Sequence, residues 1–369
     1  MSELMPCGLL GGRFAPVLLL FACLGHCPAT ALADEYAVGA DLSFLAQAEQ
    51  SGRVFTDNGV AKPGLELFKD HGYNWIRLRL FHSPTELPND LDYTIALAND
   101  AKQRGFKFLL NYHYSDTWAD PQKQFLPHAW EGMSHDELEQ AVFEYTRDTM
   151  VAFRAAGVAP DMVQIGNEVI GGMLWPDGRL PKNWENFADL LKAGIRGVDA
   201  GLVDADGRVA ARPKIMIHID RGGDRGATES FLNHCRQYGV EYDVIGQSYY
   251  PWWHGSLDNL RDNLAFMANE YDKDIMLVEV AYNWRRAEYR DEPGPFPETP
   301  AGQRQFLTEV DRIVRATPHG RGKGIFWWEP AVSRGPIASR GMFDDEGNAL
   351  PVLTVFDEPI RVASPASGE

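Results

Sequence analysis

The feature that most constrains the fold is a regular alternation of two kinds of segment from Tyr36 onward. Short apolar segments alternate eight times with longer segments whose apolar residues recur at the three- and four-residue spacing of a helix. Such alternation forms a parallel sheet, and eight repeats close it into a barrel. The predicted strands are residues 37–42, 75–81, 107–112, 162–166, 214–219, 244–248, 275–280 and 324–328. The predicted helices include 93–104, 136–156, 184–200, 228–238, 257–271 and 303–316.

We therefore predict an α/β fold, a single-domain (β/α)8 TIM barrel over residues 34–369. A doubly wound open sheet is the competing fold. No glycine-rich dinucleotide loop follows the first strand, so that fold would lack its usual ligand. No low-complexity linker divides the chain, and the stretch 291–300, rich in Pro and Gly, is expected to form a loop over the barrel mouth.

The first 33 residues are expected to be a signal peptide and not part of the fold. Arg13 precedes an apolar run over 14–24, and the A-x-A pattern at 31–33 predicts cleavage before Asp34. The run is too short to span a bilayer. We expect an exported protein, secreted or periplasmic. Residues 20–23 loosely resemble a lipoprotein processing site, so lipid anchoring through Cys23 is the alternative.

The charge and the cysteines exclude several classes of partner and cofactor. A net charge of −17 and a pI near 5.0, with no basic cluster, argue against nucleic acid. Three of the four cysteines lie in the leader, and the remaining Cys235 cannot form an internal disulfide. Phosphate-binding, zinc-protease, EF-hand and Gly-x-Ser-x-Gly motifs are absent from the sequence. We expect no cofactor, no metal and no obligatory protein partner.

Two predicted strands carry a glutamate at the far end. Glu168 follows an apolar run and Asn167, and Glu279 lies near the end of the strand predicted at 275–280. A single Glu usually lies in a surface loop. The functional face of a parallel barrel, however, is formed by the carboxyl ends of its strands, where these two residues would meet. Two carboxylates in one site are what glycoside hydrolysis requires.

Two arginines on the second predicted strand need acidic partners. Because side chains alternate along a strand, Arg77 and Arg79 share one face. Inside a barrel, each guanidinium must be paired with an acid. Glu168 and Glu279 are the candidate partners, and a structural residue such as Asp41 is the alternative partner for one of the arginines.

Polar and aromatic side chains follow several other predicted strands. One such histidine is usually a packed core residue, and Trp and Tyr also fill cores. Their recurrence at one edge of a sheet favours a site with hydrogen-bonding groups and flat apolar walls, as a sugar requires. With Arg77, Arg79 and Asn167, the candidate binding residues are His113, Asp116, Trp118, His218, Tyr249, Tyr250, Trp252 and Trp328. Alternation points only one of Tyr249 and Tyr250 inward, and the sequence leaves open which one.

Taken together, the motifs resemble those of glycoside hydrolase family 53, the arabinogalactan endo-β-1,4-galactanases of clan A. The matching stretches are GADLS (39–43), DHGYNWIRLR (70–79), YHYSDTWADP (112–121), VQIGNE (163–168), GMLWP (172–176) and IGQSYYPWWHG (245–255). The resemblance implies that Glu168 is the acid/base and Glu279 the nucleophile. It also implies that Asn167 contacts the 2-hydroxyl of the sugar at subsite −1, and that Trp328 lies beneath that sugar.

The chain departs from the family pattern after the last two strands. The family usually has Trp-Glu-Pro-Ala-Trp after strand 8, whereas here 328–331 is followed by Val332. Strand 7 continues Ala281-Tyr282-Asn283, where the family more often has Thr or Ser near the carboxylate and Pro near the aromatic residue. Some bacterial members bind calcium in long loops here, and no comparable run of acidic ligands is present.

The expected function is a retaining endo-β-1,4-galactanase that acts on pectic arabinogalactan by double displacement. A related clan A enzyme, a mannanase or β-1,4-glucanase, would share the two carboxylates and differ in the walls of the cleft. A sugar-binding barrel without catalysis is the alternative outside enzymes. In each case the expected partner is a polysaccharide.

Overall fold

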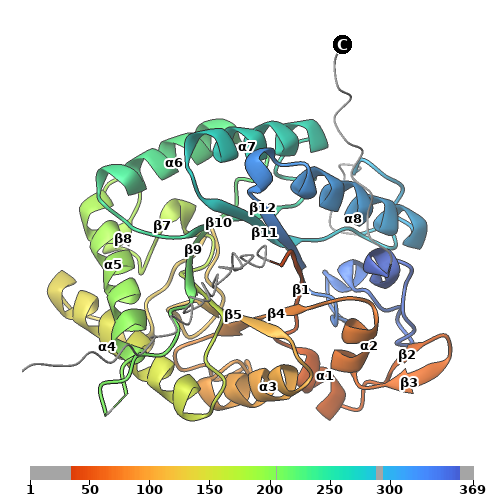
Figure 1. The fold of residues 1–369 in the computed structure, drawn as a ribbon, viewed down its shortest axis with the longest axis horizontal. Helices are drawn as coiled ribbons and strands as arrows, with labels where there is room; N and C mark the ends of the chain where they lie inside the picture. Colours follow the sequence, from red (N-terminus) through yellow and green to blue (C-terminus); the bar gives the residue numbers. More distant parts are fainter. Residues whose placement is uncertain (1–34, 205, 288–293, 358–369) are drawn as a thin grey trace, which may run out of the picture. The chain divides into compact units, whose positions relative to one another are not determined.

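The computed structural model describes residues 35–204, 206–287 and 294–357 (Figure 1). The predicted signal peptide, Cys23 and part of the loop predicted at 291–300 lie outside these ranges. Within the described ranges, no helix combines the length and the apolar composition that crossing a membrane would need. Cys235 is buried on a helix and forms no disulfide.

Eight parallel strands form a closed barrel, which confirms the predicted fold class (Figure 1). Around the barrel the order is β1, β12, β11, β10, β9, β6, β5 and β4, so neighbours in the chain are neighbours in the sheet. The strands are β1 (Ala37–Asp41), β4 (Trp75–Leu80), β5 (Lys107–Tyr112), β6 (Met162–Ile165), β9 (Lys214–Ile219), β10 (Val244–Tyr249), β11 (Asp274–Val280) and β12 (Gly322–Trp327). Each predicted strand lies within two residues of an observed one at both ends.

Helices lie outside the barrel, as Figure 1 shows. The six predicted helices are observed as α3 (Leu91–Gln103), α4 (His135–Ala155), α5 (Trp184–Gly201), α6 (Arg225–Gln237), α7 (Leu257–Glu270) and α8 (Pro300–Arg315). In the described part of the chain, 3₁₀ turns and no α-helix follow β12, so the eighth unit is incomplete. The 3₁₀ turns are η1 (His128–Trp130), η2 (Val169–Gly171), η3 (Pro318–Gly320), η4 (Ala338–Arg340) and η5 (Leu353–Phe356).

The sequence did not predict several short elements in the connections. They are α1 (Leu45–Gln50), the β2 (Phe55–Asp57) and β3 (Val60–Lys62) hairpin, α2 (Gly64–Asp70), and the two-residue strands β7 (Gly172–Met173) and β8 (Gly178–Arg179). Such short pieces carry too few residues for a periodic pattern. Five of the six predicted helices begin at a capping side chain, and α5 does not. Ser134 and Glu137 form a capping box at α4, and Ser256 with Asn259 forms another at α7.

The barrel interior is apolar near the amino ends of the strands and polar near their carboxyl ends. One buried cluster takes its members from all eight strands: Ala37, Trp75, Leu109, Met162, Met216, Val244, Met276, Val278 and Phe326. Two positions further along a strand the side chain returns to the same face. There, Arg77 follows Trp75, Asn111 follows Leu109, and His218 follows Met216, all of them buried. The apolar cluster therefore forms a closed floor, and the polar groups above it face the carboxyl end.

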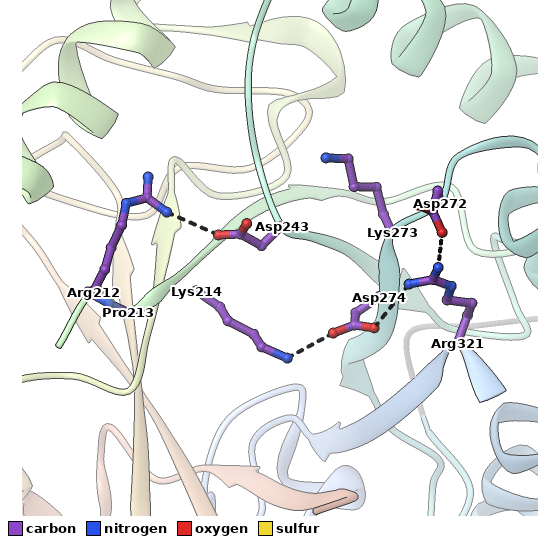
Figure 2. A pocket seen from close by; sticks show the side chains of 8 residues that line it. All are labelled: Arg212, Pro213, Lys214, Asp243, Asp272, Lys273, Asp274 and Arg321. Carbon is purple, nitrogen blue, oxygen red and sulfur yellow. Dashed lines mark hydrogen bonds and ion pairs between the residues drawn. The ribbon is translucent and has the colours of Figure 1, made fainter. Parts of the chain in front are cut away.

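The opposite, amino-terminal end of the barrel carries a set of ion pairs (Figure 2). Arg212 pairs with Asp243 at 3.3 Å, Lys214 with Asp274 at 2.8 Å, and Arg321 with Asp272. These residues line a shallow cavity of about 380 Å³. Most of these side chains are partly exposed, and pairs of that kind contribute roughly 0–1 kcal/mol each. Their position at the ends of neighbouring strands favours a role in stability over one in chemistry.

Candidate active site

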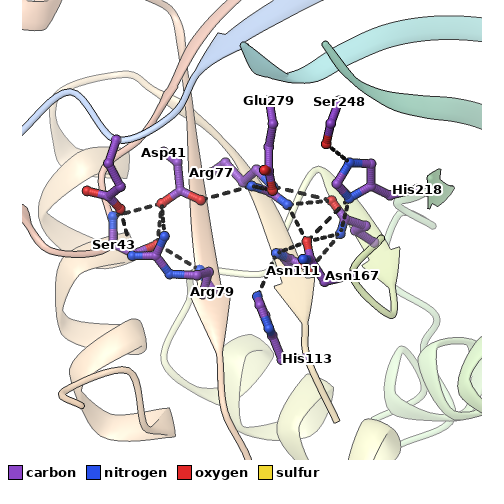
Figure 3. Close-up of polar contacts among 12 residues, drawn as sticks. Asp41, Ser43, Arg77, Arg79, Asn111, His113, Asn167, His218, Ser248 and Glu279 are labelled. Atoms are coloured by element: carbon purple, nitrogen blue, oxygen red, sulfur yellow. Dashed lines mark hydrogen bonds and ion pairs between the residues drawn. The ribbon is translucent and has the colours of Figure 1, made fainter. Parts of the chain in front are cut away.

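Arg77 lies at the centre of a buried hydrogen-bond network above the apolar floor (Figure 3). Its Nη1 donates to Oε1 of Glu279 at 2.8 Å and to Oδ2 of Asp41 at 3.0 Å. Its Nη2 donates to Oδ1 of Asn167 at 2.8 Å, and Nε to Oε1 of Gln164 at 3.3 Å. Arg77 thus joins β1, β4, β6 and β11, and it contacts one of the two predicted carboxylates directly.

Arg79 pairs with acids other than the two predicted carboxylates. Its Nη2 donates to Oε1 of Glu329 at 2.6 Å, and its Nη1 lies 3.5 Å from Oδ1 of Asp41. The guanidinium also lies 4.4 Å from the ring centres of Phe44 and Trp118. The alternative expectation, that one of the two arginines pairs with a structural acid and not with Glu168 or Glu279, therefore applies to Arg79. Asp41 serves both arginines, and the sequence had not assigned Glu329 as an acidic partner.

Glu329 is fully buried, and the state of its proton affects stability. Burial raises the pKa of its carboxyl from 4.5 to about 8; Arg79 opposes this shift and Asp41 adds to it. The folded protein then keeps a proton on Glu329 at pH values where the unfolded chain has lost it. By linkage, the contribution of Glu329 to stability is complete below about pH 4.5 and is lost as the pH rises towards 8.

We expect Glu329→Gln to remove this pH dependence, because Gln keeps an oxygen for Arg79 and has no proton to release. The variant should melt within a few degrees of the wild type at pH 5 and several degrees above it at pH 8. Melting curves of both proteins from pH 5 to 8 measure the difference, and Glu346→Gln, at an exposed position, serves as the control. If the melting temperatures of Glu329→Gln and the wild type change equally with pH, Glu329 does not carry the proton.

Glu168 lies in a tight turn directly after β6. Gly166 has φ 78° and Glu168 has φ 47°, both in the left-handed region. A side chain at Gly166 would come within 2.6 Å of Val169, so the turn requires glycine there. The turn directs the Glu168 side chain to a buried position, where its Oε1 accepts a hydrogen bond from Oγ of Ser248 at 2.7 Å.

The surroundings of Glu168 favour its protonated form. Burial raises the pKa of Glu168 well above its ordinary value, and the charges of Glu279 and Asp220 raise it further, while the hydrogen bond from Ser248 acts in the opposite direction. A carboxyl that keeps its proton near neutral pH can act as a general acid.

Glu279 lies on β11 in a different environment. Its Oε1 accepts from Arg77, and its Oε2 accepts from the hydroxyl of Tyr250 at 2.9 Å. Tyr250 is therefore the tyrosine that faces this carboxylate. Tyr249 donates to the backbone oxygen of Gly255 at 3.0 Å and stacks on Phe306 of α8. The ion pair and the phenol leave Glu279 oriented and charge-balanced, as a nucleophile should be.

The two glutamates lie close together. One oxygen of Glu168, one oxygen of Glu279 and one ring nitrogen of His218 all lie within 4.8 Å of one another. Carboxyl groups about 5–5.5 Å apart are typical of retaining glycosidases, and those about 6.5–9.5 Å apart of inverting ones. The short oxygen-to-oxygen separation matches the retaining class. The same spacing could admit a metal ion, but His218 already uses both ring nitrogens in hydrogen bonds.

The two predicted histidines are buried and hold neighbouring groups in place. His113 accepts from the backbone N–H of Ala119 at 3.0 Å and contacts the amide of Asn111 at 3.2 Å. Burial, followed by the charges of Arg79 and Arg77, holds the pKa of His113 well below its usual value. The pKa of His218 is likewise well below its usual value, chiefly because of burial. Both rings are thus neutral donors and acceptors within the network.

Asn167 lies within the network, and hydrogen bonds fix its side-chain amide. Its Oδ1 accepts from Arg77 and from Asn111, at 2.8 and 3.1 Å, and its Nδ2 donates to the backbone oxygen of Ala119 at 2.8 Å. The amide group has a second N–H, which these contacts leave for a ligand.

Two predicted binding residues in the loop after β5 have different surroundings. Asp116 accepts from the backbone N–H groups of Ser83 and His128, at 2.9 and 2.8 Å, so its oxygens hold loop backbone. Trp118 covers Arg79, and its ring centre lies 6.2 Å from that of Trp328. Trp118 thus belongs to the site, whereas the contacts of Asp116 are those of a loop residue.

Aromatic rings from the segments that follow β10 and β12 form one wall around Arg340. Trp328 lies 6.3 Å from the ring of Tyr250 and is half-buried, whereas Trp327 is buried and donates to the backbone oxygen of Arg340. The guanidinium of Arg340 lies 5.2–5.7 Å from four ring centres, and its side chain is buried. Those rings belong to Tyr250, Trp252, Trp253 and Trp328. Of the two adjacent tryptophans, Trp328 is the one that faces the site.

Besides Glu329, Asn111 and Arg340, the structure places other residues in the site that were not among the predicted site residues. Ser248 contacts Glu168, Gln164 contacts Arg77 and Asn111, and Asp220 has a buried oxygen without a hydrogen-bond partner among the described residues. Each lies on the inward face of its strand or just beyond it. A polar residue at an inward position of an apolar strand was the signal that could have identified them.

A closed (β/α)8 barrel with two buried carboxylates at the carboxyl ends of β6 and β11 defines a glycoside hydrolase by fold and site together. The family comparison agrees and is more specific. The chain belongs to glycosyl hydrolase family 53, whose family model matches residues 37–356.

Individual relatives cover nearly the whole chain. An uncharacterized protein of Niallia circulans is 42% identical over 344 residues, which cover 88% of this chain and 90% of that protein. An arabinogalactan endo-beta-1,4-galactanase of Thermothelomyces thermophilus is 35% identical, covering 86% of this chain and 98% of the relative. A solved structure from a study of two fungal beta-1,4-galactanases is 34% identical, with a TM-score of 0.80 over 88% of this chain and 99% of that one.

Proposed function

We propose that the protein is a retaining endo-β-1,4-galactanase that hydrolyses the galactan of pectic arabinogalactan. The observation that carries the reaction type is the pair of carboxylates in unlike environments. Glu168 is buried with its pKa raised, and Glu279 is ion-paired with Arg77. The substrate is supported by family membership and by the galactanases among the relatives.

The two carboxylates divide the reaction between them. Glu279 attacks the anomeric carbon while Glu168 gives its proton to the departing oxygen, which leaves a glycosyl ester on Glu279. Glu168, now ionised, takes a proton from water as that water attacks the same carbon and releases Glu279. Two inversions give net retention. Before the attack, the hydroxyl of Tyr250 and Nη1 of Arg77 hold the two oxygens of Glu279.

The aromatic side chains around the two carboxylates suit the binding of a sugar chain. Trp328 is proposed to lie beneath the sugar at subsite −1, with Trp118 and Trp252 further along the cleft. A cavity of about 610 Å³ lies between the loops after β1 and β12 and is lined by Phe44 and Val332, among others. It offers room for further sugars beyond Trp118, whose ring lies 5.8 Å from that of Phe44.

Release of reducing ends from galactan, mannan and β-1,4-glucan tests the substrate. We expect galactan to be hydrolysed and the other two not. Hydrolysis of mannan or glucan instead would assign a different endo-glycanase of the same fold. Saturable binding of galactan without any product over long incubation would indicate a sugar-binding barrel.

Asn167→Ala should lower kcat and kcat/KM together by about 10- to 100-fold, because a hydrogen bond to the 2-hydroxyl strengthens as charge develops at the sugar ring. Steady-state kinetics on galactan separate the two constants. Asn186→Ala, which removes an amide bonded to Asp177 on the outside of the barrel, is the control. A rise in KM alone would mean that Asn167 binds the ground state and the transition state equally well.

Chelation should leave activity and melting temperature unchanged, because the nucleophile is a protein side chain and no step needs a metal. The acidic residues Asp344, Asp345 and Glu346 are the nearest approach to a calcium site after β12. Oδ1 of Asp344 accepts from the backbone N–H groups of Glu346 and Asn348, at 3.1 and 2.8 Å. A melting temperature that falls in EDTA and recovers with calcium would contradict this expectation.

We further propose export, with cleavage of residues 1–33 and a catalytic domain from 34 to 369. Mass spectrometry of the protein secreted by its host would identify the new amino terminus. A lipid on Cys23 would support the anchored alternative instead.

A further inference from the structure

Glu168 is held by a chain of hydrogen bonds that begins on a different strand. Oγ of Ser248, on β10, donates to Oε1 of Glu168 at 2.7 Å. The same Oγ lies 2.8 Å from Nε2 of His218, on β9. His218 and Ser248 are both completely buried. Three neighbouring strands, β6, β9 and β10, thus meet at the carboxyl of Glu168.

The direction of each hydrogen bond follows from the groups around Nδ1 of His218. Two donors face it, the N–H of Glu168 at 3.4 Å and Nε2 of Gln164 at 3.2 Å, so Nδ1 carries a lone pair and accepts. Oδ1 of Asn167 lies 3.3 Å away and accepts from Arg77 and Asn111 instead. A neutral imidazole with Nδ1 as acceptor has its proton on Nε2. Nε2 therefore donates to Oγ of Ser248, and the serine hydroxyl donates its only proton to Glu168. The ring that accepts from the main chain of Glu168 thus also orients its side chain.

The two oxygens of Glu168 are consequently unlike. Oε1 is occupied by Ser248, whereas Oε2 has no hydrogen-bond partner among the described residues. An oxygen that already accepts a hydrogen bond is the poorer site for the proton. We propose that Ser248 and His218 are positioning residues that direct the acid/base proton of Glu168 to Oε2. This proposal rests on the proposed role of Glu168 and reassigns His218 from the sugar to the carboxyl.

The chain of hydrogen bonds from His218 through Ser248 to Glu168 would act in both halves of the reaction. In the first half, Oε2 presents its proton to the leaving oxygen because Oε1 is held in place. In the second, Ser248 stabilises the ionised carboxylate while Oε2 accepts a proton from water. Other ionisable groups also surround Glu168 and share control of its titration. They are Glu279 on β11, Asp220 after β9, Asp120 after β5, and Tyr250 after β10.

Ser248→Ala tests the chain, with two readouts. The first is the titration of the Glu168 carboxyl carbon by NMR in labelled protein, which needs no substrate. Loss of a donor to the charged form should raise the pKa of Glu168. The second is the pH dependence of kcat/KM on galactan. The alkaline limb of this profile should move to higher pH, and the maximal kcat/KM should fall by about tenfold.

His218 provides a matched pair of variants. His218→Gln keeps an N–H near the position of Nε2 and should retain the wild-type titration, whereas His218→Phe lacks that donor and should shift it in the same direction as Ser248→Ala. The double variant Ser248→Ala with His218→Phe should shift no further than Ser248→Ala alone, because the two residues act in series. If Ser248→Ala does not fold, the comparison of His218→Gln with His218→Phe decides the matter.

Thr149→Val is the control for loss of a buried hydroxyl. Thr149 bonds Tyr112 at 2.6 Å between α4 and the outer face of β5. An unchanged Glu168 titration in folded Ser248→Ala, or an equal shift in Thr149→Val, would overturn the proposal. If the wild type does not hydrolyse galactan, the proposed function fails, but the NMR titration still tests the hydrogen-bond chain.

Discussion

Replacing Glu279 by Gln is expected to reduce galactan hydrolysis on the order of 10⁵-fold, because the residue that forms the covalent intermediate is lost. The fold should persist. Gln keeps an oxygen for Arg77, its amide group can still meet the hydroxyl of Tyr250, and Arg77 retains Asp41 as a counter-ion. Reducing-end release and a melting curve on the same preparation measure both quantities. Glu139→Gln, which changes a surface partner of Arg196, is the control.

Glu279→Ala adds a test of stereochemistry. The smaller side chain leaves space beside the anomeric carbon that a small anion such as azide can enter. On a β-galactoside with a good leaving group, azide should restore turnover and form the α-galactosyl azide, since one displacement inverts the centre. Near-normal activity of Glu279→Gln, or a β-azide from Glu279→Ala, would remove Glu279 from the role of nucleophile.

Glu168→Ala should lower kcat/KM on galactan by roughly 10³-fold, the usual contribution of a general acid. On a dinitrophenyl β-galactoside the loss in the glycosylation step should be slight, because that leaving group departs without a proton. The pH profile should also change. The pKa of Glu168 is raised by burial and by Glu279, so the wild type loses activity when Glu168 ionises on the alkaline side. The alanine variant has no such limb.

Asp220 is the competing candidate for the acid, and the same experiment separates the two. Burial raises the pKa of Asp220 to about 6, and Arg221 opposes the shift. Asp220→Asn should keep the alkaline limb and the dependence on the leaving group. If Asp220→Asn removes the limb and Glu168→Ala does not, the assignment of the acid is wrong.

The strands and the carboxylates could be predicted from local pattern alone. An apolar run that ends in a polar residue identifies a buried strand, and Glu168 and Glu279 followed from that rule. Whether a neighbouring residue faces inward was harder to predict. At Tyr249 and Tyr250 the answer depends on the register shift between Gln247 and Ser248, which alters the pairing of β10 with β11. An irregularity of that kind is set by packing with the next strand and leaves no mark in the sequence of one strand.

The sequence likewise did not predict which acids pair with the buried arginines. Arg77 and Arg79 had the expected face, but their acidic partners come from other strands. Asp41 lies on β1, beside β4 in the sheet, and Glu329 follows β12, which reaches β1 only when the barrel closes. Ser248 was missed for a related reason. A serine in an apolar strand usually fills space, and only the position of Glu168, two strands away in the sheet, shows what its hydroxyl contacts.

The position of Arg340 among four rings limits how loops can be exchanged between enzymes of this fold. The residue belongs to the connection after β12, but its guanidinium lies against tryptophans and a tyrosine that follow β10, and that tyrosine holds Glu279. A transplanted loop without this arginine would leave four aromatic faces without their cation. An engineer who grafts either connection would therefore have to move both, as a single cassette.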